Sequence, residues 1–147
     1  MLISADRRIF VGRRARMAER MAWQMPQGGV DKGETPLEAA CRELGEEVGT
    51  SRALYLRETR DWITYDVPDD LRPKHWQGRW HGQAQKWFAL SFTGTDRDID
   101  LDTHGDPHGP EFVEWQWMTA AEMMKRIVAF KRPVYDAVLE EFGDLVA

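Results

Sequence analysis

Residues 28–50 read GGVDKGETPLEAACRELGEEVGT, and this stretch carries the clearest helix signals in the chain. Thr35 can cap the first turn, Pro36 suits the first helical position, and Glu38 completes a capping box. Gly49 suits the left-handed position that ends a helix. The sequence therefore predicts a helix that begins at Pro36 and ends just before Gly49.

The predicted helix, residues 36–48, has two faces that differ in residue type. At about 100° per residue, four side chains fall within roughly 60° of one another and form the expected buried stripe: Leu37, Cys41, Leu44 and Val48. On another face, Glu43 repels both Glu46 and Glu47, each by up to about 0.5 kcal/mol, and the helix dipole disfavours negative charge near the C-terminal end. A hard divalent cation such as Mg²⁺ would reverse the sign of these terms. Charge spacing alone leaves open whether this face is a solvated acidic surface or a cation site.

Composition excludes several classes of protein. The chain has 147 residues, 42% hydrophobic and 31% charged, which fits one compact domain and is too apolar for a disordered chain. It contains no apolar run of about 18 residues, and its start, MLISADRR, lacks the features of a signal peptide. Cys41 stands alone, which excludes an internal disulfide and fits a reducing cytoplasm. The net charge of −5 argues against general electrostatic binding of nucleic acid, although a local basic patch could still bind it.

The rest of the chain combines short strand patterns with a few helices. Alternation of apolar and polar residues predicts strands over residues 8–11, 53–56, 62–67, 86–92 and 112–118. Helical periodicity predicts two further helices, over residues 120–127 and 133–142. This order indicates an α+β fold with a mixed sheet, within a single domain over residues 1–147. The long acidic stretch 93–110 contains Gly and Pro and is interpreted as a mobile loop.

The spacing around the first helix distinguishes the two interpretations of its acidic face. Gly28 is followed after five residues by Glu34, and after seven more by Arg42-Glu43-Leu44-x-Glu46-Glu47-x-Gly49. This pattern resembles the signature box of the Nudix hydrolases; Thr50 departs from it, because the family usually has a bulky aliphatic residue there. The resemblance implies an α/β/α sandwich with a mixed sheet between helices. It also implies hydrolysis of nucleoside diphosphates linked to another group, with Mg²⁺ or Mn²⁺ required.

The resemblance also implies roles for individual residues of the box. Three carboxylates would be metal ligands: Glu43, Glu46 and Glu47. Glu34 would pair with Arg42 and so hold the preceding loop against the helix. Gly28 and Gly29 would let the backbone approach the metal, with a carbonyl near Gln27 as a further ligand.

Similarity outside the box points to one bacterial branch of the family, which contains the RNA pyrophosphohydrolases and the diadenosine polyphosphate hydrolases. The stretches that carry this similarity are WQMPQGGVDKGE (23–34), GQAQKWF (82–88), PEFVEWQW (110–117) and FKRPVY (130–135). The branch implies that Glu111, from a late loop, completes the metal site. It implies a substrate pocket formed by Arg14, Lys86, Val128, Phe130 and Lys131. The branch usually has a Tyr-Arg-x-Asn-Val-Gly-like segment before the first strand, so either the start is truncated or misassigned, or one sheet edge is incomplete.

Residue chemistry alone leaves the base pocket open. Phe130 could stack on a base while Lys131 binds phosphate. A buried Phe in the core, next to a solvent-exposed Lys, would account for the same sequence. A basic cluster near the N-terminus suits a polyphosphate or an RNA 5′ end, yet such runs are usually solvated surface. Its members are Arg13, Arg14, Arg16 and Arg20.

Together these patterns predict a pyrophosphohydrolase that uses Mg²⁺, Mn²⁺ or another divalent cation. Water would attack phosphorus, and Glu47 or Glu111 would accept its proton. The expected substrate is the tri- or diphosphorylated 5′ end of RNA, converted to the 5′-monophosphate. Two alternatives stay open: hydrolysis of a dinucleoside polyphosphate such as diadenosine tetraphosphate, and a non-catalytic sensor of nucleotide or RNA. We expect a cytoplasmic monomer with no membrane partner.

Overall fold

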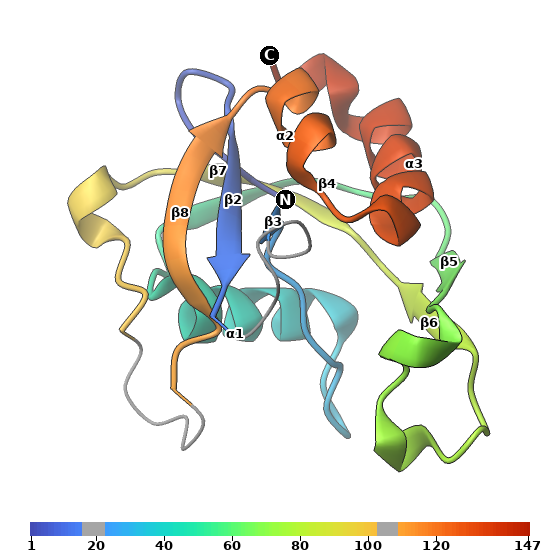
Figure 1. Ribbon diagram of the computed structural model, residues 1–147. Helices are drawn as coiled ribbons and strands as arrows, with labels where there is room; N and C mark the ends of the chain where they lie inside the picture. The colour runs from blue at the N-terminus through green and yellow to red at the C-terminus, as the bar shows by residue number, and fades with distance from the viewer. Residues whose placement is uncertain (16–22, 103–108) are drawn as a thin grey trace.

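The computed structural model describes residues 1–15, 23–102 and 109–147, and a mixed six-stranded sheet lies at its centre (Figure 1). The strands are β1 (Leu2–Ile3), β2 (Ile9–Arg14), β3 (Trp23–Gln24), β4 (Ala53–Glu58), β7 (Phe88–Phe92) and β8 (Phe112–Met118). Their order is β3-β2-β1-β7-β4, and β8 pairs with β2. β1 runs parallel to β7, whereas β2 and β8 are antiparallel, which confirms the predicted mixed sheet.

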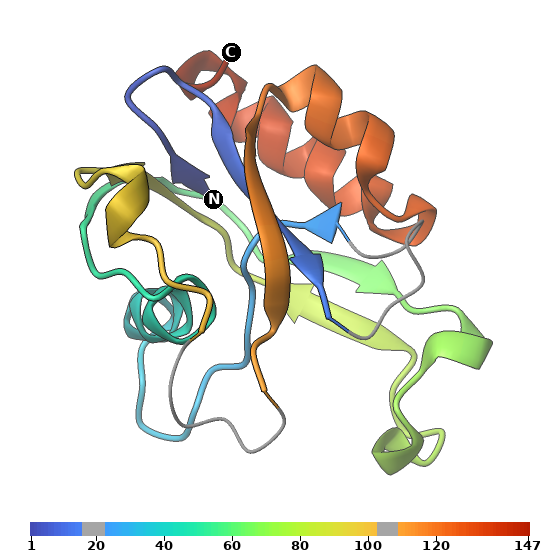
Figure 2. The ribbon, with the colours of Figure 1, turned by 60° about the vertical axis from the view of Figure 1, so that its left-hand side comes forward.

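Helices cover both faces of this sheet (Figure 2). One face carries α1 (Pro36–Val48), and the other carries α2 (Ala120–Arg126) and α3 (Arg132–Phe142). The α1 start follows the sequence signals, because Thr35 and Glu38 form the predicted capping box and Gly49 ends the helix at φ 73°. The α+β sandwich is therefore confirmed. In the described part of the chain, no helix has the length and apolarity needed to cross a membrane.

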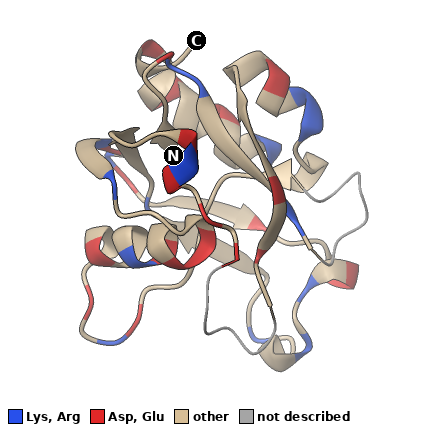
Figure 3. Ribbon diagram, turned by 90° about the vertical axis from the view of Figure 1, so that its left-hand side faces the viewer, with Lys and Arg blue, Asp and Glu red and all other residues tan. Residues whose placement is uncertain are grey.

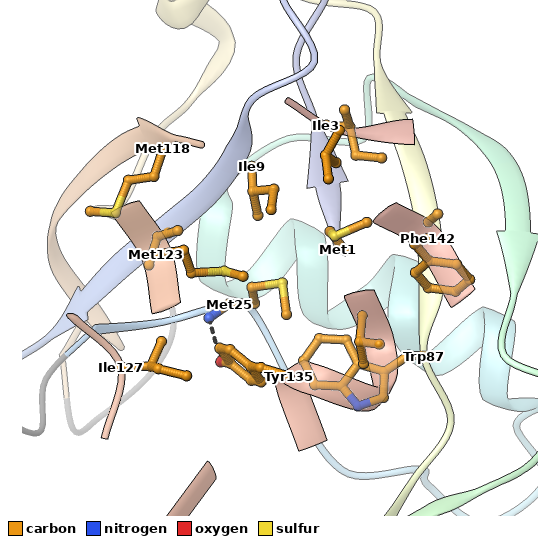
Figure 4. Close-up of a cluster of buried hydrophobic side chains, with 14 of the residues drawn as sticks. Met1, Ile3, Ile9, Met25, Trp87, Met118, Met123, Ile127, Tyr135 and Phe142 are labelled. Atoms are coloured by element: carbon orange, nitrogen blue, oxygen red, sulfur yellow. Dashed lines mark hydrogen bonds between the residues drawn. The ribbon is translucent and has the colours of Figure 1, made fainter. Parts of the chain in front are cut away.

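Two hydrophobic clusters hold the layers together, one on each face of the sheet. Ile9 and Val11 of β2 point into the cluster beneath α2 and α3, while Phe10 points toward α1, as the period of a strand requires. In the first cluster the Met25 backbone N–H donates to the Tyr135 hydroxyl at 2.8 Å, and the Tyr135 ring meets Trp87 edge-on (Figure 4). This hydrogen bond fixes the start of the segment that leads into the site.

A two-stranded hairpin extends from this sandwich, formed by β5 (Ile63–Asp66) and β6 (Gly82–Gln85). Its connection, residues 67–81, contains short 3₁₀ turns at Asp69–Leu71 and Lys74–Trp76. The connection projects beyond the rest of the molecule in two views (Figures 1 and 2). A hydrogen bond from Val67 N–H to the His81 carbonyl closes it at 2.8 Å.

Several predicted element bounds need correction. β2 continues to Arg14 beyond the predicted 8–11, because it pairs with β8 along its whole length. The stretch predicted as a strand over 86–92 begins only at Phe88, and β6 precedes it without an alternating pattern. β1 and β3, which were not predicted, are two residues long, too short to show a period. The strand predicted over 112–118 is present with these bounds as β8, and the remaining predicted strands and helices have ends shifted by no more than two residues.

The predicted buried stripe of α1 is partly wrong. Cys41 is exposed and Leu37 is only half-buried, whereas Ala39 and Glu47 are buried together with Leu44 and Val48. On a helical wheel the buried arc is therefore centred near Glu47 rather than near Cys41. The cause is tertiary, because the chain preceding α1 covers the glutamate face.

The stretch predicted as a mobile loop is packed over its first part. The Asp100 N–H donates to the Val48 carbonyl at 2.9 Å, and Trp117 Nε1 donates to Asp96 Oδ1 at 2.9 Å. Ile99 and Leu101 contact the cluster beneath α1. Residues 103–108 of the predicted loop lie outside the described residues.

The contact between Gly12 and Phe112 offers a test of this packing. A Cβ built on Gly12 in β2 would lie 2.4 Å from Cγ of Phe112, whose side chain is fully buried. We expect Gly12→Ala to lower the free energy of unfolding by about 1–3 kcal/mol, measured by urea denaturation. Gly45 of α1 is the matched control, because its added Cβ meets nothing within 4 Å. Gly45→Ala should raise stability by about 0.5–1 kcal/mol, and a neutral Gly12→Ala would contradict the packing.

Candidate functional site

A buried carboxyl group, Glu47, lies where α1 meets the segment that precedes it. Its side chain is 8% exposed, and Oε2 accepts a hydrogen bond from the Gln27 backbone N–H at 3.0 Å. Burial and the charge of Glu111, with a smaller contribution from Glu43, raise the pKa of Glu47 to about 9, although the Gln27 hydrogen bond and Arg14 oppose the shift. Such a carboxyl group holds either a proton or a cation at neutral pH.

Glu43 packs directly against the loop backbone. A Cβ built on Gly28 would lie 1.8 Å from Cδ of Glu43, so only glycine leaves room for this carboxylate beside the chain. The close approach explains why a glycine stands at this position of the box.

Arg42 connects the loop to the helix through several hydrogen bonds. Its Nε and Nη2 meet both oxygens of Glu34 at 2.8 and 3.0 Å, and Nη2 also donates to the Gly29 carbonyl at 2.8 Å. Nη1 donates to Glu43 at 2.8 Å and to Glu46 at 3.1 Å. The hydrogen bond from Arg42 holds the pKa of Glu34 below its usual range. The guanidinium thus fixes the loop and two helix carboxylates at once, and Figure 3 shows these acidic positions along α1 and the preceding loop.

The carboxylate oxygens of the site are of the type that binds a divalent cation, but they do not form a cluster around one point. Glu43, Glu46 and Glu47 share α1, and Glu111 lies close enough to Glu47 to raise its pKa. Among the described residues, however, no three acidic, His or Cys side chains converge on one point. Arg42 donates to both Glu43 and Glu46, so a cation would compete with the guanidinium group for these two carboxylates.

A buried ammonium group stands on the other side of Gln27. Lys131 is 7% exposed, and its Nζ donates to Gln24 Oε1 at 2.6 Å and to Gln27 Oε1 at 3.2 Å. Burial and the charge of Arg14 lower the pKa of Lys131 to about 8, while Glu47 and Glu111 act in the opposite direction. The alternative of a solvated lysine is therefore wrong.

Arg14 and Glu111 complete the polar group around Lys131. Arg14 ends β2, and its Nε meets Glu111 Oε1 at 2.8 Å, with each side chain about one-third exposed at 36% and 35%. The pairing of β2 with β8 places them, because Arg14 is in register with Phe112. Two anionic and two cationic side chains thus lie together at one end of the sheet.

The chain matches the family model for the NUDIX domain over residues 1–138. It belongs to the Nudix family. A protein of Rhodospirillum rubrum named RNA pyrophosphohydrolase is 52% identical over 97% of the chain and 83% of that protein. One of the same name from Rickettsia bellii is 47% identical over 99% of the chain and 88% of that protein.

Solved structures agree with the Nudix fold. The dihydroneopterin triphosphate pyrophosphohydrolase of E. coli matches with a TM-score of 0.73 at 19% identity, covering 95% of this chain and 88% of that one. A C. elegans Ap4A hydrolase matches with a TM-score of 0.63 at 16% identity, covering 97% and 96%. At these identities the likeness concerns the fold alone. Nudix hydrolases generally use divalent cations, which agrees with the oxygen-rich donor set.

The three other residues of the predicted substrate pocket, Phe130, Val128 and Lys86, have different surroundings in the structure. Phe130 is half-buried, and its ring stacks on Tyr65 with centroids 6.3 Å apart. Val128 is buried, and its carbonyl accepts from the Lys131 N–H at 3.1 Å. Lys86 is engaged elsewhere, because its Nζ donates to the carbonyls of Thr59 and Arg60.

Lys86 instead borders a cavity of about 380 Å³ between α1 and the strands β6 and β7. The same cavity is lined by Gln27, Gly28 and Glu43 of the candidate site, so the role of Lys86 in binding substrate stays a prediction. Of the predicted basic cluster, Arg13 pairs with Glu114 at 2.9 Å, and Arg16 and Arg20 lie outside the described residues.

Sequence reasoning missed several neutral members of the site. Gln24 accepts from Lys131, Gln85 Nε2 donates to Gln27 Oε1 at 3.1 Å, and Tyr65 supports Phe130. Neutral amides carry no chemical signature of their own in a sequence. The available signals were the two stretches of family similarity that contain Gln24 (23–34) and Gln85 (82–88), and in the second of them only Lys86 was assigned a role.

The pKa of Glu47 predicts how stability changes with pH when no divalent cation is bound. The unfolded chain releases this proton near pH 4.5 and the folded chain near 9, so between these values the folded state binds more protons and rising pH lowers its stability. We expect the free energy of unfolding of the wild type in EDTA to fall by about 1–3 kcal/mol more than that of Glu47→Gln when the pH rises from about 6 to about 8.5. Urea denaturation at each pH measures this difference. Mg²⁺ should reduce the loss, and a difference independent of pH would contradict the burial of Glu47.

Proposed function

We propose that this Nudix chain hydrolyses phosphoanhydride bonds at the 5′ end of RNA, converting a 5′-tri- or diphosphate into a 5′-monophosphate. The observation that carries the proposal is identity of 47% and 52%, over nearly the whole chain, to bacterial proteins named RNA pyrophosphohydrolase. The site chemistry supports it, because carboxylates suited to a cation lie beside a buried ammonium group and an aromatic ring.

The carboxylates would hold Mg²⁺, or Mn²⁺ in its place. The proposed ligands are Glu43, Glu46, Glu47 and Glu111, with a backbone carbonyl near Gln27. A cation held by these residues would neutralise phosphate oxygens and lower the pKa of the attacking water. Gly28 leaves room for Glu43 beside the backbone, and Arg42 with Glu34 holds the loop in place.

Two carboxylates are candidates for accepting the proton from the attacking water. Glu47 has one oxygen bound to the Gln27 N–H, which leaves its second oxygen as the candidate acceptor. Glu111 has one oxygen in the ion pair with Arg14. Comparison of Glu47→Gln with Glu111→Gln distinguishes them, since loss of the base removes turnover more strongly than loss of one ligand oxygen.

The cationic side of the site would bind the substrate. Lys131 and Arg14 would contact phosphate oxygens, and two neutral amides orient the Lys131 ammonium group in advance. Phe130, supported by Tyr65 and next to Val128, would stack on a base. Burial disfavours the charged form of Lys131, and a bound phosphate group would favour it again. Binding of phosphate and protonation of Lys131 therefore reinforce each other.

Replacing Glu47 tests the catalytic assignment. We expect Glu47→Gln to lower kcat by more than about 10²-fold in Mg²⁺, because the amide can neither accept the proton nor ligate as a carboxylate does. Glu140→Gln removes an exposed carboxylate from α3 and should leave kcat unchanged. Circular dichroism confirms that both variants fold, and near-normal turnover by Glu47→Gln would refute the assignment.

A competition experiment tests the substrate. The protein with Mg²⁺ receives equal amounts of a short 5′-triphosphorylated RNA and of diadenosine tetraphosphate, and the products are identified. We expect monophosphorylated RNA to form with the higher kcat/KM. Preferred cleavage of the dinucleotide would assign the chain to dinucleoside polyphosphates instead. Binding without turnover of either would favour a sensor.

A further inference from the structure

The connection between β5 and β6 exposes side chains that the proposed catalysis does not use. Trp80 is 55% exposed, and Lys74 and Arg79 are exposed beside it in sequence. In the portion of the chain that the structure describes, neither cation has an ion-pair partner. These three residues are called the hairpin surface below.

Trp80 is exposed although the connection that carries it has a packed local structure. Trp76 in the same connection is buried at 9%, as is Val67 at 7%, and Arg72 Nε donates to the Val67 carbonyl at 2.8 Å. Gln77, with a φ of 50°, precedes Gly78, with a φ of 72°, and this pair reverses the chain before Trp80. One indole of the connection therefore anchors it, while the other remains open to a ligand.

The charge along residues 71–95, which follow Asp69 and Asp70 in the connection, differs from that of the whole chain. The net charge is −5, yet residues 71–95 contain no Asp or Glu. The same stretch carries Lys74 and Arg79, together with His75 and His81. Its two other cations are already paired, Arg72 with Asp69 and Lys86 with Glu58. A cationic stretch with an exposed indole suits a flexible polyanion that has bases to stack, which is single-stranded nucleic acid.

The hairpin also joins this surface to the proposed site. Tyr65 of β5 stacks on Phe130 and lies in register with Gln83 of β6. The next pair in register, Asp66 with Gly82, leads directly into the connection. A strand of RNA with its first bases at Phe130 would therefore meet the hairpin surface with the nucleotides that follow.

We propose that the hairpin surface binds single-stranded RNA downstream of the 5′-terminal nucleotides. Trp80 stacks on a base, and Lys74 and Arg79 contact phosphates. This inference rests on the proposed function, because it concerns the remainder of the same substrate.

The test compares a 5′-triphosphorylated dinucleotide with a 5′-triphosphorylated single strand of about 12 nucleotides. Trp80→Ala should raise KM about fivefold or more for the long RNA only, with kcat unchanged, and Trp80→Phe should recover most of the loss. Lys74→Gln/Arg79→Gln should also raise this KM and weaken its logarithmic salt dependence by about 1.4, since each single-strand phosphate contact contributes about 0.7. Arg8→Gln/Arg97→Gln, two exposed cations away from the hairpin, is the matched control and should change neither.

Failure of this inference is distinguishable from failure of the proposed function. Absence of hydrolysis at both lengths by the wild type would refute the proposed function. Hydrolysis at both lengths with an unchanged KM for Trp80→Ala would refute the inference alone and leave a protein partner as the class to test. Fluorescence anisotropy with a labelled 5′-monophosphorylated RNA decides the point without turnover, because equal affinity of wild type and Trp80→Ala also overturns it.

Discussion

One residue, Gln27, connects the three parts of the molecule that form the site. Its backbone N–H binds Glu47 on α1, and its side-chain oxygen accepts from Lys131 ahead of α3 and from Gln85 on β6. The segment that carries Gln27 is itself fixed by the hydrogen bond from Met25 to Tyr135 in the core. This segment thus links charged groups from both helical layers, Glu47 on α1 and Lys131 ahead of α3. The site therefore depends on how a short stretch without regular structure packs.

Burial acts against both charges that the chemistry uses. It raises the pKa of Glu47 and lowers the pKa of Lys131, so each group is biased toward its neutral form. The two do not form a hydrogen-bonded pair with each other, since Gln27 lies between them and contacts both. A cation beside Glu47 and phosphate beside Lys131 would each supply the missing counter-charge. The charged forms of Glu47 and Lys131 are thus less favourable in the free protein than with cation and phosphate bound. Binding of one ligand would therefore favour binding of the other without any change of fold.

The parts that could be predicted from the sequence are those fixed by local physics. The ends of α1 follow from a capping box and a left-handed glycine, and the spacing of the acidic residues identified the Nudix box. The burial of Glu47 and Lys131 could not be read in this way, because it arises from packing of the 25–30 segment and of the hairpin. Cys41 was predicted to be buried and is exposed for the same reason. Periodicity gives the angles between side chains around a helix, but it does not give which side of the helix faces the sheet. Strands of two residues, such as β1, carry no period at all.

The separation of charge along the chain explains how an acidic protein can be suited to an acidic substrate. Interactions between exposed charges that lie further apart than the Debye length, about 8 Å at physiological salt, are largely screened, so the groups nearest the substrate matter more than the net charge. Lys131 and Arg14 lie among the carboxylates, where a cation would cancel the nearest negative charge. The stretch without acidic residues begins at the connection of the hairpin and returns through Lys86 to the sheet. A polyanion bound along the hairpin would meet the carboxylates only at its 5′ end, where a bound cation would offset their repulsion.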